Sequence, residues 1–128
     1  MELQIDPASR LPIYRQLCSQ IREGIARGQF QSGEQLPSVR ELSRRLVVNP
    51  NTVARVYTEL EREGVLNARP GLGVFVAEQK TDLTKRARMK RFGELLDGFL
   101  TEAVHLGLTA DEVTSVVDER VGRFEWKT

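Results

Sequence analysis

The chain has 128 residues, a formal net charge of +1, 40% hydrophobic residues and one cysteine, Cys18. This length fits one ordinary domain or two small ones, and the hydrophobic fraction predicts a modest core without a large enzyme cavity. One cysteine excludes an internal disulfide and a cysteine-based zinc site. No run approaches the ~20 apolar residues of a membrane span, and the start, MELQIDPASR, does not resemble a signal peptide. We therefore expect a cytoplasmic protein without a membrane partner.

The first predicted helix runs from Leu11 to Gly28. Pro12 suits a first helical turn, and Gly28 suits a left-handed C-cap. Apolar residues recur at the spacing of one helical face: Tyr14, Leu17, Cys18, Ile21 and Ile25.

Two further helices are predicted close behind it. The second begins at Ser38, with Glu41 three residues later in the pattern of a capping box. The sequence VVNP ends this helix, because the residue before a proline is pushed out of helical geometry. The third begins with Asn49 as N-cap and Pro50 in its first turn, and it ends at Gly64. Its inward face comprises Val53, Val56, Tyr57 and Leu60.

The rest of the chain predicts a hairpin and two more helices. Two β-prone runs, residues 65–69 and 72–76, surround a turn with Pro70 and Gly71. The composition then changes, which places a domain boundary between residues 79 and 80. A fourth helix is expected from about Asp82 to His105, and a fifth follows a second capping box formed by Thr109 and Glu112.

The order helix, short helix, helix, hairpin is that of a winged helix-turn-helix. The predicted fold class is mainly α with a small β-hairpin. Residues 1–79 form the winged helix-turn-helix DNA-binding domain, and residues 80–128 form a helical hairpin for dimerisation. A small effector has room between the two terminal helices or at the joint between the domains, but no residue identifies such a molecule. No cofactor or metal is predicted.

In such a domain the third helix enters the major groove, and its N-terminal residues reach base edges. Asn51 and Thr52 are short, so the helix end can approach DNA closely and bond bases or phosphates. Arg55 lies one turn later on the same outward face, and its guanidinium suits guanine O6 and N7. The alternative is that the Asn-Pro sequence only caps the helix, which leaves Asn51 and Thr52 unexplained.

Four other residues are predicted to contact DNA. Arg40 suits a phosphate or base edge, and its alternative is a surface ion pair with a glutamate. Ser38 is first a helix cap whose hydroxyl or N–H can also meet a phosphate. At the tip of the hairpin, Arg69 suits the minor groove, and Gly71 lets the turn approach a backbone closely.

Positive charge is concentrated in two zones of a nearly neutral chain. Residues 38–58 hold four arginines against one glutamate, a local net charge of +3, and KRARMKR at residues 85–91 holds five bases. Such zones predict that a limited part of the surface contacts an anionic partner. A run of charged residues is also common on a solvated face. A winged-helix module that docks an acidic protein partner is the alternative function.

The terminal helices predict a homodimer. A pair of helices of this size buries its own apolar stripes poorly, and a second copy of the chain would cover them. The alternative is a monomer whose helices fold onto the winged helix. The residues assigned to dimerisation are Phe92, Leu95, Leu96, Phe99, Val113 and Val117.

No feature of the sequence favours an enzyme. The lone His105 has no metal-ligand spacing near it, and no nucleophile motif or phosphate loop appears. The GLG sequence at residues 71–73 lacks the strand and helix that flank a nucleotide loop.

Residues 12–76 resemble the GntR family of bacterial transcription regulators. The most specific pieces are GEQLPSVRELS and NPNTVARVYTELEREG. The resemblance implies operator contacts by Arg40, by Asn51 and Thr52, and by Arg69 and Gly71 at the wing tip. The second half resembles the YtrA-like subfamily, in which two terminal helices form the dimer. The function implied is a repressor that binds a pseudo-palindromic operator on double-stranded DNA as a homodimer.

Overall fold

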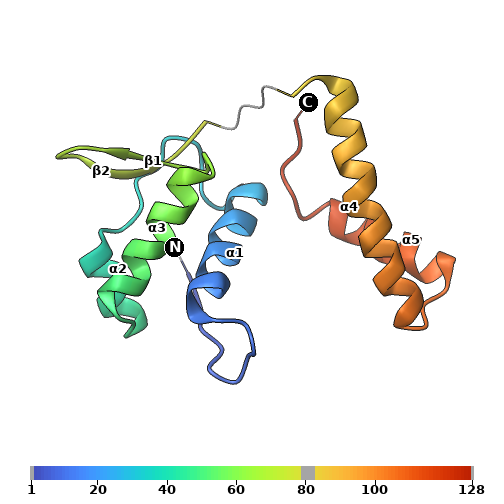
Figure 1. Ribbon diagram of the computed structural model, residues 1–128, viewed down its shortest axis with the longest axis horizontal. Helices are drawn as coiled ribbons and strands as arrows, with labels where there is room; N and C mark the ends of the chain where they lie inside the picture. The colour runs from blue at the N-terminus through green and yellow to red at the C-terminus, as the bar shows by residue number, and fades with distance from the viewer. Residues whose placement is uncertain (1, 79–82, 128) are drawn as a thin grey trace. The chain divides into compact units, whose positions relative to one another are not determined.

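The computed structural model describes residues 2–78 and 83–127 of the chain. The chain forms two compact units, Met1–Gln79 with Glu125–Thr128 and Lys80–Phe124. The boundary expected between residues 79 and 80 lies outside the described residues. The elements, shown in Figure 1, are α1 (Ile13–Ala26), α2 (Val39–Leu46), α3 (Pro50–Arg62), β1 (Leu66–Arg69), β2 (Gly73–Val76), α4 (Lys85–His105) and α5 (Ala110–Val121).

Helix α1 is held in place at both ends by other parts of its unit. Ahead of it, the side chain of Gln16 accepts a hydrogen bond from the Asp6 N–H at 2.9 Å and donates one to the Leu11 carbonyl at 2.8 Å. At its far end, the Glu125 N–H donates to the Ala26 carbonyl at 2.8 Å. The C-terminal tail therefore packs with the first unit.

Helix α2 begins at its predicted cap and ends in a strained turn. The Ser38 hydroxyl accepts a hydrogen bond from the Glu41 N–H at 3.1 Å. The predicted capping box is incomplete, because the Glu41 carboxylate instead accepts a hydrogen bond from Arg45 at 2.7 Å. After Leu46, Val47 adopts a left-handed conformation with φ of 55°, which is rare for a β-branched residue.

Helix α3 follows its prediction closely. The Asn49 side chain accepts a hydrogen bond from the Asn51 N–H at 2.8 Å, and Pro50 occupies the first turn. The predicted inward face is buried. Its Tyr57 hydroxyl donates to the Pro37 carbonyl at 2.6 Å, which joins α3 to the start of α2. Burial raises the pKa of Tyr57, so the phenol stays protonated as a donor.

The two strands form an antiparallel hairpin that projects beyond the three helices (Figure 1). Gln35 supports its turn, because the Gln35 side chain donates a hydrogen bond to the Leu72 carbonyl at 2.9 Å. Gly71 has φ of 76°, a conformation that favours glycine. The hairpin is thus the wing that the sequence predicts.

The core lies between α1, α2, α3 and the base of the hairpin. Its largest fully buried side chains are Leu17, Ile21, Leu42, Val53, Val56, Leu60 and Leu66. The three helices of this unit are therefore fixed relative to one another, which gives their exposed faces a defined geometry.

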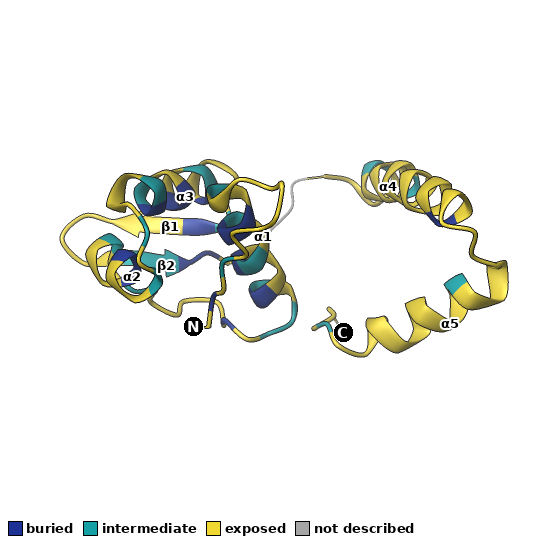
Figure 2. Ribbon diagram, turned by 90° about the horizontal axis from the view of Figure 1, so that it is seen from below, coloured by how far each residue is buried: buried dark blue, intermediate teal, exposed yellow. Residues whose placement is uncertain are grey.

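The second unit consists of two helices that bury very little. Helix α4 begins at Lys85 rather than near Asp82, because the Thr84 hydroxyl caps it by accepting a hydrogen bond from the Ala87 N–H at 3.1 Å. Asp82 itself lies outside the described residues. In α4 and α5 the described residues include a single buried one, Ala103, and Figure 2 shows both helices exposed along almost their whole length.

Candidate nucleic-acid interface

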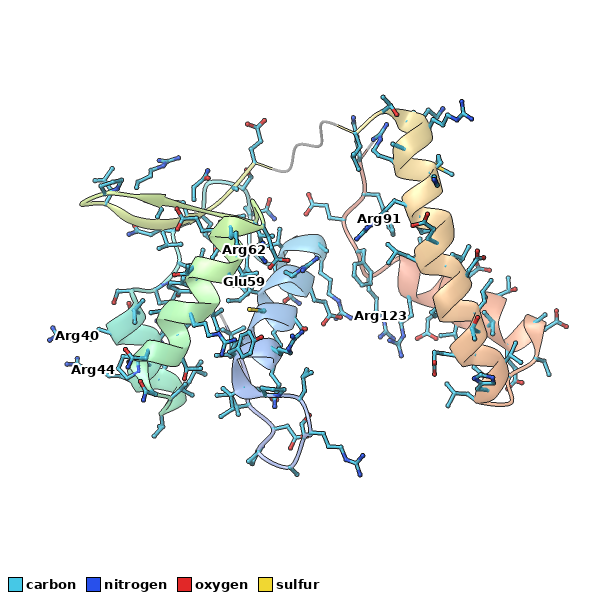
Figure 3. All side chains as sticks on the ribbon, in the orientation of Figure 1. Arg40, Arg44, Glu59, Arg62, Arg91 and Arg123 are labelled. Atoms are coloured by element: carbon cyan, nitrogen blue, oxygen red, sulfur yellow. The ribbon has the colours of Figure 1, made fainter. Side chains whose placement is uncertain are left out.

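Two arginines of α2 form the clearest cationic feature of the first unit. Arg40 and Arg44 are four residues apart, both exposed, and Figure 3 shows both side chains extending away from the helical body. Neither forms an ion pair within residues 2–78 and 83–127, because the neighbouring Arg45 takes Glu41 as its partner at 2.7 Å. The ion pair considered as the alternative role of Arg40 is therefore absent from these residues. Both charges are free to meet an anion.

The N-terminus of α3 presents its polar residues less uniformly than expected. Asn51 and Arg55 are exposed, whereas Thr52 is half-buried. Successive residues of a helix are turned by about 100°, so Asn51 and Arg55 share one face while Thr52 lies at its edge. Thr52 is thus less exposed than Asn51 and Arg55, and its contact with DNA stays a prediction.

Arg55 has a neighbour that the sequence does not reveal. Its guanidinium carbon lies 3.7 Å from the centre of the Tyr14 ring, on α1. The helical spacing places Tyr14 only on the inward face of the first helix. No spacing links residues 14 and 55, so the contact follows only from the packing of α1 on α3.

The wing carries a further arginine. The guanidinium of Arg69 lies 4.5 Å from the centre of the Phe75 ring on the opposite strand, and the side chain remains exposed. Gly71 adds a turn conformation rather than a tight contact, because a Cβ at this position would meet no atom within 4 Å.

Most carboxylates near these arginines already have partners. Glu41 pairs with Arg45, and Glu59 pairs with Arg62 within α3. The hydrogen bond from Arg62 lowers the pKa of Glu59, so this carboxylate stays charged and bound. The arginines without an ion pair in the described residues thus include those on α2, on the start of α3 and on the wing, which are the elements that a winged helix presents to DNA.

The basic run 85–91 belongs to the second unit. All five bases lie in the first two turns of α4 and are exposed. Within the described residues none of them forms an ion pair with a carboxylate. The run is therefore an open cationic surface at one end of α4.

Comparison with known proteins assigns the family. Residues 13–76 match the family model described as bacterial regulatory proteins, gntR family. The chain belongs to the GntR family. It is 35% identical over 117 residues to the HTH-type transcriptional repressor YtrA of Bacillus subtilis (strain 168), across 91% of this chain and 90% of that protein. Because the match spans 91% of this chain and 90% of that protein, the chain is a YtrA-like member of the GntR family.

Solved structures agree with the fold. A transcriptional antiterminator from Listeria monocytogenes EGD-e superposes with a TM-score of 0.80 at 32% identity, covering 100% of this chain and 96% of that chain. The DNA-binding domain of AraR in complex with operator ORX1 superposes with a TM-score of 0.53 at 29% identity, covering 60% of this chain and 96% of that chain. The winged helix-turn-helix with a C-terminal helical region is confirmed.

These findings establish the general function. The chain is a DNA-binding transcriptional regulator of the GntR family and not an enzyme. In the part of the chain that the structure describes, no helix is long and apolar enough to cross a membrane. The contacts of single residues with DNA and the assembly of the chain stay predictions.

Proposed function

We propose that this GntR regulator is a repressor that binds a pseudo-palindromic operator as a homodimer. The observation that carries the proposal is the unpaired positive charge on the exposed faces of α2 and α3. Arg40 and Arg44 extend from α2, and Asn51 and Arg55 share the outward face at the start of α3. This is the geometry in which a recognition helix enters the major groove while the preceding helix follows the backbone.

In this proposal α3 contacts the bases and α2 contacts the phosphates. Asn51 and Arg55 meet base edges, because an amide and a guanidinium can each form two hydrogen bonds to a purine. Arg40 and Arg44 meet phosphates, which fix the register of the helix on the duplex. The half-buried Thr52 reaches only the nearer phosphate or base.

Ser38 and the wing complete the contact. The Ser38 oxygen already accepts the Glu41 N–H, so the hydroxyl hydrogen is the group left to donate to a phosphate. Arg69 enters the minor groove, where a narrow groove attracts cations. Gly71 supplies the turn that presents Arg69 rather than a contact of its own.

The exposed apolar surface of α4 and α5 supports the homodimer. Five of the six residues assigned to dimerisation are at least 38% exposed: Phe92, Leu95, Leu96, Phe99 and Val117. Val113 is half-buried. An isolated pair of helices with such a surface is a poor monomer, and a second copy of the chain presents the same stripe in return.

A dimer also explains how a small domain reaches specificity. One winged helix offers few base contacts, whereas a two-fold dimer reads two half-sites about one helical turn apart. Bound at a promoter, such a dimer blocks access to the DNA it covers. The similarity to a protein named as a repressor supports repression as the outcome.

Selection from a pool of random duplexes tests this proposal. The full chain is bound to the pool at physiological salt, and the recovered duplexes are sequenced over several rounds. We expect enrichment of an inverted repeat whose halves are about ten base pairs apart between centres. Recovery without any enriched sequence would contradict the operator proposal and favour the alternative of docking to an acidic protein. Enrichment of a single unrepeated half-site would contradict the dimer.

A further inference from the structure

The contact between Tyr14 and Arg55 joins a helix outside the helix-turn-helix pair to the proposed reading residue. The guanidinium carbon lies 3.7 Å from the ring centre, which is a stacking distance. Tyr14 is half-buried and packs against the core, whereas Arg55 is exposed. The ring is therefore the fixed partner and the arginine side chain is the one that is held.

We propose that Tyr14 is a positioning residue for base recognition, which holds the Arg55 guanidinium at the angle in which it meets a base edge. This inference rests on the proposed function, because it assigns Tyr14 a part in the same DNA contact. It adds a specificity-determining residue from α1, a helix to which the operator contacts predicted above assign no residue.

The Arg55 guanidinium can stack on the Tyr14 ring and bind a base edge at the same time, because the two contacts use different parts of the group. A guanidinium on an aromatic ring uses its flat face, and its five N–H groups point outward in the plane at right angles to that contact. The N–H edge therefore stays free for guanine O6 and N7. An arginine side chain loses much rotamer freedom when it binds, so a side chain already held by a ring loses less at the moment of DNA contact.

The surroundings of Arg55 favour the ring over any competing partner. Glu59 lies one turn further along α3, but it already accepts hydrogen bonds from Arg62. Arg15 also lies near the Tyr14 ring, with its guanidinium carbon 5.6 Å from the ring centre. The two arginines carry like charges, so Arg15 does not draw Arg55 away from the groove.

A second contact joins α1 to the end of α3. Arg22 lies eight residues beyond Tyr14 on α1, and it pairs at 2.6 Å with Glu63, the C-cap of α3, eight residues beyond Arg55. The two contacts therefore lie at corresponding points of helices that run side by side. Tyr14 is thus presented to Arg55 by a pair of packed helices rather than by a loop.

A double-mutant cycle on the selected operator tests the proposal. The dissociation constant is measured for the wild-type chain, Tyr14→Leu, Arg55→Ala and the double variant, with Tyr14→Phe as the matched control that keeps the ring. Because Tyr14 also packs on the core, the thermal transition of each variant is recorded first. If Tyr14→Leu does not fold, Tyr14→Met replaces it, since methionine fills a similar volume without a planar ring.

We expect Tyr14→Leu to weaken operator binding by about two- to five-fold, the effect of one exposed cation–π contact. Tyr14→Phe should bind as wild type. In the Arg55→Ala background Tyr14→Leu should have no further effect. A repeated selection with Tyr14→Leu should show weaker preference at one base of each half-site, the base that Arg55→Ala also relaxes.

Three results would overturn the proposal. Equal effects of Tyr14→Leu with and without Arg55 would mean that Tyr14 acts only on the fold. Tighter binding by Tyr14→Leu would mean that the ring withholds Arg55 from DNA. Unchanged base preference would mean that the contact has no part in recognition. Failure of the proposed function is seen separately and earlier, because the wild-type chain would then enrich no sequence, and the positioning role would fall with it.

Discussion

Arginines of one short helix differ in whether their charge is already neutralised. Arg44 extends from α2 without an ion pair among the described residues, while the adjacent Arg45 pairs with Glu41. Both are exposed, and a substitution to alanine removes the same atoms from each. Comparing Arg44 with Arg45 therefore distinguishes an arginine that is available to DNA from one that a carboxylate already neutralises.

Arg44→Ala should weaken binding to all duplexes by a similar factor. It should also reduce the slope of the logarithm of affinity against the logarithm of salt concentration by about one, because one phosphate contact is lost. Arg45→Ala is the matched control and should leave that slope nearly unchanged. A salt titration by fluorescence anisotropy measures both, and equal slopes for the two variants would contradict the phosphate role of Arg44.

The turn between α2 and α3 stores conformational strain at Val47. Its side chain is 90% exposed, so it contributes little packing, yet its backbone is left-handed with φ of 55°. A non-glycine residue in this region costs roughly 1–2 kcal/mol, and asparagine tolerates it best among residues with a side chain.

Val47→Asn should therefore raise the free energy of unfolding by about 1 kcal/mol. Urea denaturation gives this value, with an unchanged m-value as evidence that only the folded state is affected. Val47→Ala is the control, because it shortens the side chain but keeps a Cβ without a local hydrogen-bonding group. Lower stability of Val47→Asn than of wild type would show that Val47 makes a stabilising contact in the turn.

Leucines of equal size lie at opposite extremes of exposure in the first unit. Leu60 is fully buried on the inward face of α3, and Leu72 is 66% exposed on the wing. Leu60→Ala should lower the free energy of unfolding by about 2–5 kcal/mol through a lost core contact and a new cavity. Leu72→Ala, the same chemical change, should stay within about 0.5 kcal/mol. Thermal denaturation compares them, and similar losses would contradict the position of the core.

At the scale of the elements, the N-terminus of α5 carries a pH-sensitive cap. The Glu112 carboxylate accepts a hydrogen bond from the Thr109 N–H at 2.9 Å, and the Thr109 hydroxyl accepts one from the Glu112 N–H at 3.1 Å. The bond from the Thr109 backbone lowers the pKa of Glu112 below its ordinary value. Because the pKa of Glu112 is lower in the folded chain than in the unfolded chain, the charged carboxylate stabilises the fold at pH values above the unfolded pKa. This stabilisation is lost as the pH falls through the folded pKa.

Helicity should therefore fall as acid is added below about pH 4.3, the ordinary pKa of glutamate. Glu112→Gln should remove the loss of helicity that protonation of Glu112 causes, because glutamine keeps a capping oxygen that does not titrate. Circular dichroism over an acid titration measures it. The matched control is Glu102→Gln on α4, whose carboxylate has no partner in the described residues. An identical acid transition in all three chains would contradict the role of the cap.

The elements also show which features a sequence reveals. Helix α3 was predictable because Asn49, Pro50 and Gly64 are local signals at its two ends. The start of α4 was misplaced because the cap at Thr84 follows several other polar residues that resemble it. The left-handed Val47 was not predictable, since valine rarely takes that conformation, and the turn is imposed by packing of α2 and α3 on the core.

Residues of the candidate site also differ in whether the sequence reveals their role. Arg40, Asn51 and Arg69 were found from the order of elements and from a motif. Arg44 was counted only as one of the four arginines of residues 38–58, because its difference from Arg45 depends on which of the two Glu41 contacts. The contact of Tyr14 with Arg55 joins residues on separate helices, so it required the packed structure.

At the scale of the whole molecule, the apolar stripe of α4 is the part of the dimer proposal that a single substitution can test. Phe99 lies within the stripe and is 50% exposed. Thr101 is also exposed, and two residues along a helix turn it to the opposite side. Phe99→Glu should convert a dimer at micromolar concentration to a monomer in sedimentation equilibrium, whereas Thr101→Glu should remain dimeric. A wild-type chain that sediments as a monomer would contradict the homodimer.

The central claim is that this chain recognises a particular DNA sequence through the exposed faces of α2 and α3. Its most direct test compares the dissociation constants of the wild-type chain for the selected duplex and for a duplex of the same length and composition in scrambled order, both at physiological salt. The account predicts at least about 10³-fold tighter binding to the selected duplex. Affinities within about ten-fold of each other would show that the basic surface binds anions without reading sequence, and would contradict the account.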